Sequence, residues 1–263
     1  MERVLTIIDK EWAEVFKNRI VLFTVAFIPV MFTILPLVIL YFTNSISGGA
    51  SASETDLPPS FRAACGNLPA ADCLQIYILN QFLLVFMMMP LIIPVAIAAY
   101  SIVGEKTTHS LEPLLATPIK TTELLAAKGL AAAIPGILAT WACFIVFIIA
   151  APFVGAKPAV MLHLLSPIWV LAVFGCGPLM AIMSVNFAII VSSRVTDPRT
   201  AEQLSAVIIV PIMAVLFGQL SGLIVLNVQF MLVAIGLLLF ADIGLVYLGA
   251  RLFQRETILT KWK

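Results

Sequence analysis

The residue with the clearest chemical potential is Asp242, the only charged residue in the long apolar run between Glu202 and Arg251. A carboxyl group inside a membrane is costly and usually faces a cavity or a partner. At the rise of an α-helix, Asp242 lies roughly 13 Å from Arg251 along this run. Two interpretations stay open. Asp242 contacts a substrate or a cation in a central pathway, or it has a structural role, through a hydrogen bond to a neighbour such as Ser184 or Asn186 or at a subunit interface.

The other reactive residue types are not arranged for catalysis. No Walker A pattern occurs, so we do not expect this chain to bind ATP through a P-loop. The two histidines, His109 and His163, belong to no set with the spacing of metal ligands. The apolar runs hold no nucleophile beside a base. The sequence therefore predicts no catalytic residue, no metal site and no cofactor on this chain, and it argues against an enzyme.

The composition indicates a membrane protein. The chain has 263 residues, of which 62% are hydrophobic and 11% are charged, whereas a typical soluble domain is about 25% charged. Its mean hydropathy is +1.10. A soluble globular enzyme and a disordered chain are therefore excluded. The formal net charge of +1 provides no basic surface for nucleic acid.

Long runs without charge predict an all-α polytopic protein with six transmembrane helices, each with the roughly 20 apolar residues that a bilayer requires. A short turn is expected near Asn227 and Gln229, although Gly218, Ser221 and Gly222 would also allow a re-entrant segment. The predicted helices cover residues 20–43, 76–103, 129–154, 164–193, 204–224 and 229–250 of a single transmembrane domain.

The basic residues predict the orientation. All Lys and Arg residues except Arg62 and Lys157 lie in segments that share one side of the membrane, which makes that side, with both termini, cytoplasmic. These segments are the N-terminal residues, the loops at 104–128 and 194–203, and a tail at 251–263. The main external loop, 44–75, contains Cys65 and Cys73, for which we predict a disulfide because this side is oxidising.

Residues 1–18 are expected to form an amphipathic helix that lies on the cytoplasmic membrane surface. An apolar stripe at helical spacing supports this interpretation, and Trp12 suits the membrane interface. The alternative is a helix that packs against another subunit. The stripe consists of Leu5, Ile8, Trp12, Val15 and Phe16.

The loop at 104–128 contains a short helix signal. Ser110 is a good N-cap, Glu112 suits the first turn, and Thr117–Pro118 ends the helix. The apolar residues Leu111, Leu114, Leu115 and Ile119 form one ridge of this helix. Such a ridge fits the groove of a partner protein. Alternatively, it packs on the ends of neighbouring helices or on lipid.

The sequence of this loop, GEKTTHSLEPLLATPIKTTELLAAK, closely resembles the loop of ABC-2-type permeases, whose usual form reads G-E-K-x-x-G-[ST]-L-E-x-L-L-A-T-P-[IV]. His109 stands where a glycine is common, which would change the turn before the helix. The matching residues are Gly104, Glu105, Lys106, Ser110, Leu111, Glu112, Leu114, Leu115, Ala116, Thr117 and Pro118.

The resemblance implies the fold of a type V ABC exporter in the plasma membrane of a prokaryote. Two permease chains, identical or different, would form a dimer. Two copies of a separate ATPase subunit would bind ATP and Mg²⁺ beneath it. The 110–117 segment would be the coupling helix, so that the matching residues other than Ala116, together with Ile119, contact the ATPase. Residues 1–18 would be the connecting helix.

The implied function is that of an exporter permease. Its 17 Phe outnumber its 4 Tyr and 4 Trp, which favours an apolar or amphipathic substrate such as a lipid, although the family also handles ions. Two other functions stay open. The chain could be a membrane sensor or scaffold for a partner ATPase, or a secondary transporter or channel that uses Asp242.

Overall fold

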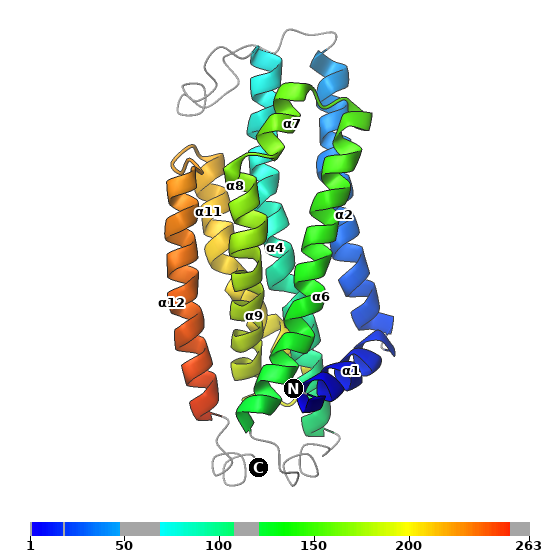
Figure 1. Ribbon diagram of the computed structural model, residues 1–263, viewed down its shortest axis with the longest axis vertical. Helices are drawn as coiled ribbons and strands as arrows, with labels where there is room; N and C mark the ends of the chain where they lie inside the picture. The colour runs from blue at the N-terminus through cyan, green and yellow to red at the C-terminus, as the bar shows by residue number, and fades with distance from the viewer. Residues whose placement is uncertain (1, 18, 48–68, 108–120, 253–263) are drawn as a thin grey trace.

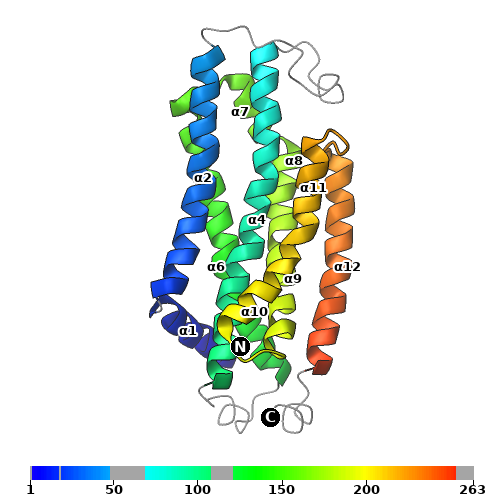
Figure 2. The same cartoon turned by 180° about the vertical axis from the view of Figure 1, so that it is seen from behind.

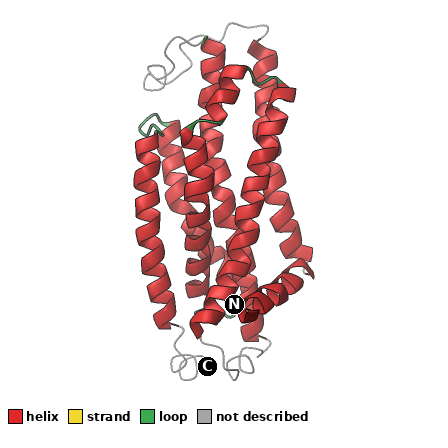
Figure 3. Cartoon of the chain, viewed as in Figure 1, coloured by secondary structure: helices red, strands yellow, loops and turns green. Residues whose placement is uncertain are grey.

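Long apolar runs become long helices in the computed structural model, which describes residues 2–17, 19–47, 69–107 and 121–252. These ranges contain helices, turns and short loops but no strand (Figure 3). The longer helices are α1 (Glu2–Lys17), α2 (Arg19–Ser47), α4 (Ala70–Thr107), α6 (Thr121–Ala150), α9 (Gly177–Ser192), α11 (Val210–Leu220) and α12 (Val228–Leu252).

Six helical segments are long and apolar enough to cross a membrane, so the predicted all-α fold with six spans is confirmed. All six run roughly along the long axis of the bundle, while α1 lies obliquely at one end (Figure 1). We call this the α1 end, and the other end, where α7 (Pro158–Leu164) lies, the α7 end. The six segments are Val21–Thr43, Asp72–Ser101, Glu123–Val154, Pro158–Ser192, Pro198–Leu220 and Val228–Gly249.

Helix α4 is the centre of the bundle. It packs against α2, α6, α9 and α11, which surround it in both views (Figures 1 and 2). The most apolar stretch of its span is 83% buried, against 11% for the span in α12. The exposed apolar faces of the outer helices are suited to lipid or to another membrane chain.

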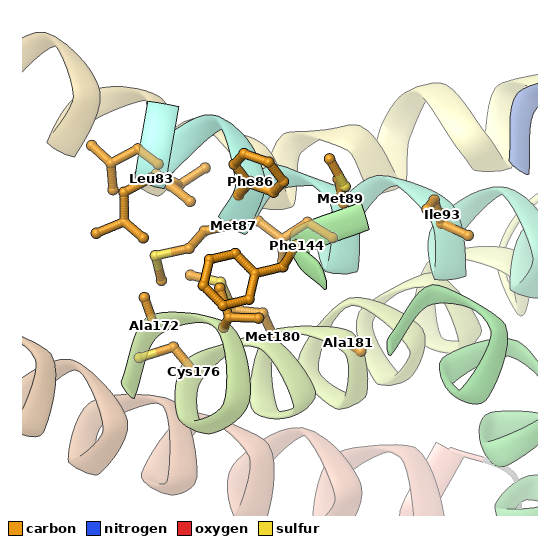
Figure 4. Close-up of a cluster of buried hydrophobic side chains, with 14 of the residues drawn as sticks. Leu83, Phe86, Met87, Met89, Ile93, Phe144, Ala172, Cys176, Met180 and Ala181 are labelled. Atoms are coloured by element: carbon orange, nitrogen blue, oxygen red, sulfur yellow. The ribbon is translucent and has the colours of Figure 1, made fainter. Parts of the chain in front are cut away.

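The core is built around aromatic and sulfur-containing side chains of α4 and its neighbours. The Phe86 ring lies 5.3 Å from that of Phe147 and 6.0 Å from that of Trp169, centroid to centroid. Figure 4 shows side chains of α4 facing Phe144 of α6 and the α9 region. Interdigitated side chains of this kind fix the helices against one another.

The fourth membrane segment is broken, whereas the sequence predicts a single helix over 164–193. Helix α7 ends before Ser166, whose backbone is extended (φ −64°, ψ 155°), and α8 (Pro167–Val170) begins at the next residue. Proline disfavours the helical conformation in the residue before it, which explains the break. A π-helix, η3 (Leu171–Cys176), then leads into α9. The span thus starts earlier, at Pro158, because α7 continues it toward the α7 end.

The fifth segment also begins before the predicted residue 204. It consists of α10 (Pro198–Ser205), the 3₁₀ turn η4 (Ala206–Ile209) and α11. The turn to α12 includes Gly222, whose φ of 75° suits a residue without a side chain. Asn227 then caps α12, because its Oδ1 accepts a hydrogen bond from the Phe230 amide at 2.7 Å. The turn between α11 and α12 stops short of the ends of α2 and α4 (Figure 1).

Candidate functional site

The predicted ATPase-contacting segment joins α4 to α6 in the sequence. Gly104, Glu105 and Lys106 belong to the last turns of α4, which continues to Thr107. The remaining predicted contact residues, Ser110, Leu111, Glu112, Leu114, Leu115, Thr117, Pro118 and Ile119, lie outside the described residues. The structure therefore describes the two helix ends between which this segment is inserted.

A buried ion pair joins those two helix ends to α1. Lys128 of α6 and Glu11 of α1 are only 6% and 2% exposed, and the Lys128 Nζ lies 2.7 Å from the Glu11 Oε1. Ser101 of α4 completes the triad, because its Oγ accepts a hydrogen bond from Lys128 at 2.9 Å and donates one to the Glu11 Oε2. One residue from each helix thus satisfies charges that would otherwise be costly to bury.

Part of the apolar face of α1 packs against the protein. Ile8 and Val15 of the predicted apolar stripe are buried against the protein, whereas Leu5 and Phe16 are exposed. The half-buried Trp12 donates a hydrogen bond from its Nε1 to the carbonyl oxygen of Ala131 at 2.9 Å. The helix is therefore docked on α6 rather than resting on lipid alone.

The Glu11–Ser101–Lys128 triad was missed in the sequence, although one signal was present. Glu11 lies three residues after Ile8 and four before Val15, so it falls within the apolar stripe. A charged residue in such a stripe needs a buried partner. The sequence predicts that the third span begins after Lys128, but Lys128 lies within α6, where Glu11 neutralises it.

Helix α10 holds α4 at the α1 end from another side. Ala201 of α10 packs in a small cluster with Ala99 and Val103 of α4. The N-cap of α10 is Asp197, whose carboxylate accepts hydrogen bonds from the amide and the hydroxyl of Thr200 at 2.8 and 2.9 Å. These hydrogen bonds to the charged form lower the pKa of Asp197.

A cavity of about 340 Å³ lies between α6, α9 and α12. Its walls are apolar except for Asn186, and small residues leave the space open. The Asn186 Nδ2 donates to the carbonyl oxygen of Ile182 at 2.9 Å. The lining residues are Leu125, Ala126, Gly129, Leu130, Ala133, Ile182, Val185, Asn186, Ile189, Val246 and Gly249.

Asp242 lies on the same side of α12 but does not line this cavity. It is 6% exposed, and neither carboxylate oxygen has a hydrogen-bond partner in the described part of the chain. The Ser184 hydroxyl instead donates hydrogen bonds to the carbonyl oxygens of Ala181 (2.9 Å) and Pro90 (3.3 Å). The structure thus forms no hydrogen bond from Asp242 to Ser184 or Asn186.

Polar contacts also join α4 to α7 at the α7 end. Lys157 forms an ion pair with Asp72, and the His163 Nε2 lies 2.9 Å from the Asn80 Oδ1. Cys73, beside Asp72, is disulfide-bonded. The predicted partner, Cys65, lies outside the described residues, so this pairing stays a prediction.

No cluster of three or more His, Cys, Asp or Glu side chains that could hold a metal ion occurs within the described ranges. Three features are therefore the candidates for function: the helix junction at the α1 end, the apolar cavity and the buried carboxyl group of Asp242.

Comparison with known proteins gives one clear result. The family described as "ABC-2 family transporter protein" matches residues 5–239, which include every described helix up to the middle of α12. A comparison with individual curated proteins found no match.

Proposed function

The chain belongs to the ABC-2 transporter family and is the membrane-embedded permease subunit of an ABC transporter, and we propose that it exports its substrate by coupling to ATP hydrolysis on a separate ATPase subunit. The observation that carries the proposal is the family match together with the apolar ridge at 111–119. Catalysis of ATP hydrolysis is assigned to the partner, which binds ATP and Mg²⁺.

We assign the coupling to the junction at the α1 end. The segment at 110–117 would insert into the ATPase as a coupling helix. Complete burial of Leu111, Leu114, Leu115 and Ile119 would contribute about 1.5–3 kcal/mol each, enough to hold a docked helix during the ATPase cycle. Movement of this segment would act directly on α4 and α6, with which it is continuous in the chain.

The contacts of α4 support this route. It packs against most of the other spans, so a displacement of its end changes the packing of the whole bundle. The Glu11–Ser101–Lys128 triad would make α1 follow the same motion, because it ties α1 to both helices that flank the coupling segment. Rigid helices with such fixed contacts can transmit a movement between distant sites.

A dimer of permease chains in a prokaryotic plasma membrane completes the proposal, with the α1 end cytoplasmic. The distribution of Lys and Arg supports that orientation. The exposed apolar faces of α2, α11 and α12 provide surface for the second permease chain as well as for lipid. The apolar cavity between α6, α9 and α12 supports an apolar or amphipathic substrate.

The proposal is tested with the Leu115→Asp variant in nanodiscs, together with its ATPase partner identified by co-purification from native membranes. A charge on the ridge should abolish the stimulation of ATP hydrolysis by the permease, while the spans stay folded in the membrane. Leu223→Asp is the matched control, because Leu223 is exposed in the turn between α11 and α12 at the other end. Undiminished stimulation of ATP hydrolysis by Leu115→Asp would contradict the coupling assignment.

A further inference from the structure

Among the described residues, no cationic side chain is paired with the buried carboxyl group of Asp242. Helix α12 packs against α8, η3 and α9, and the sequence of these elements, Pro167–Ser192, contains no acidic or basic residue. The single titratable side chain there is the buried thiol of Cys176. A carboxylate in the middle of a membrane helix is stabilised by a counter-charge, and none of these elements supplies one.

The cavity between α6, α9 and α12 begins next to Asp242. Val246 and Gly249, which line it, follow Asp242 by four and seven residues on α12, and this spacing places all three on one helix face. Buried and half-buried residues continue that face toward α9, from Met231 and Leu238 to Gly249. The cavity therefore lies about one helical turn from the unpartnered carboxyl group.

The dimensions and chemistry of the cavity suit the apolar part of a small molecule. Its volume of about 340 Å³ falls within the range of small-molecule pockets, roughly 300–1,000 Å³. The cavity has free space beside Gly249, because a Cβ atom at this residue would meet nothing within 4 Å. Asn186 adds one amide to an otherwise apolar wall.

We propose that this cavity and Asp242 together bind a lipophilic organic cation, with its apolar body in the cavity and its ammonium head at Asp242. This inference rests on the proposed function and names the substrate class of the exporter. An inorganic divalent cation would need six or more oxygen ligands, which the apolar walls do not supply. A neutral lipid would fill the cavity but leave the carboxylate without a counter-charge.

The test compares two probes that share a tail and differ in the head, decylammonium and decanol. Binding of each radiolabelled probe is measured on the full chain in phosphatidylcholine nanodiscs, and binding to empty nanodiscs is subtracted. We expect the wild-type chain to bind decylammonium at least tenfold more tightly than decanol. Asp242→Asn should remove this preference by weakening decylammonium about tenfold and leaving decanol unchanged.

Two further variants test the cavity and control for the loss of a charge. Gly249→Leu places a side chain in the open space and should weaken both probes equally. Asp72→Asn removes a carboxylate at the α7 end, where it pairs with Lys157, and should change neither affinity. This control shows that the effect of Asp242→Asn does not arise from net charge.

Equal affinity of the wild-type chain for the two probes would overturn the inference, as would a decylammonium preference that survives in Asp242→Asn. Binding of Na⁺ that depends on Asp242, without binding of decylammonium, would assign the residue to an inorganic ion and also contradict it. The measurement uses neither ATP nor the ATPase. The binding inference can therefore fail while ATP-driven export is observed, and it can hold while ATP-driven export is not observed.

Discussion

Removal of Lys128 should release α1 from the helix junction. In Lys128→Met, Glu11 would keep its buried position and lose the ammonium group that lies 2.7 Å away. Breaking a buried ion pair from one side costs about 3–5 kcal/mol, because the remaining charge is buried without compensation. At 1.4 kcal/mol for each factor of ten, the opening equilibrium of α1 should rise roughly a hundredfold to several thousandfold.

Hydrogen exchange of the α1 amides in nanodiscs measures this opening directly. The double variant Glu11→Met/Lys128→Met should restore slow exchange, because replacement of both charges by apolar side chains of similar size is often neutral. Lys10→Met is the control: its surface pair with Glu14 is 3.5 Å apart and exposed, and such pairs contribute about 0–1 kcal/mol. The reasoning is refuted if Lys128→Met exchanges like the wild type, or if the double variant exchanges as fast as Lys128→Met.

Two further predictions concern the packing of the bundle and the cap of α10. Gly136→Ala would place a Cβ 2.6 Å from the ring of Pro94, and this overpacking should destabilise the chain by about 1–3 kcal/mol, seen as a lower melting temperature. Gly236→Ala, with nothing within 4 Å, should not lower it. Asp197→Ala should speed amide exchange in α10 at neutral pH, whereas Asp197→Asn keeps the cap. Because the folded-state pKa of Asp197 is lowered, the carboxylate stabilises α10 above its ordinary pKa, and this effect should vanish as the pH falls through the lowered value. An Asp197→Ala effect that persists unchanged in strong acid would contradict this account.

The spans could be predicted because their signal is local. Charges are excluded from the bilayer core, so the gaps between charged residues mark the six spans without any knowledge of their packing. The same rule misplaced the start of the third span, because Lys128 is buried inside α6 by a contact with Glu11, 117 residues away in sequence. In the sequence, the only sign of this long-range contact is a charged residue, Glu11, within the apolar stripe of α1.

Only part of the candidate site could be predicted from the sequence, because the rest depends on contacts between distant residues. Asp242 was identifiable as an isolated charge, but its lack of a partner and its place beside a cavity depend on how α9 packs against α12. The break at Pro167 could have been expected from proline alone, whereas no sequence pattern marks the π-helix after it. The ridge at 111–119 lies outside the described residues, so its role rests on the sequence pattern and the family.

Transport in proteoliposomes tests most directly whether a separate ATPase drives this permease. The chain is reconstituted with its ATPase partner, ATP is added outside, and uptake of labelled amphipathic compounds and lipids is followed. The account predicts ATP-dependent accumulation of a probe, lost when the Walker A lysine of the partner is substituted. Accumulation driven by a proton or Na⁺ gradient in vesicles that lack the partner would contradict it and identify a secondary transporter.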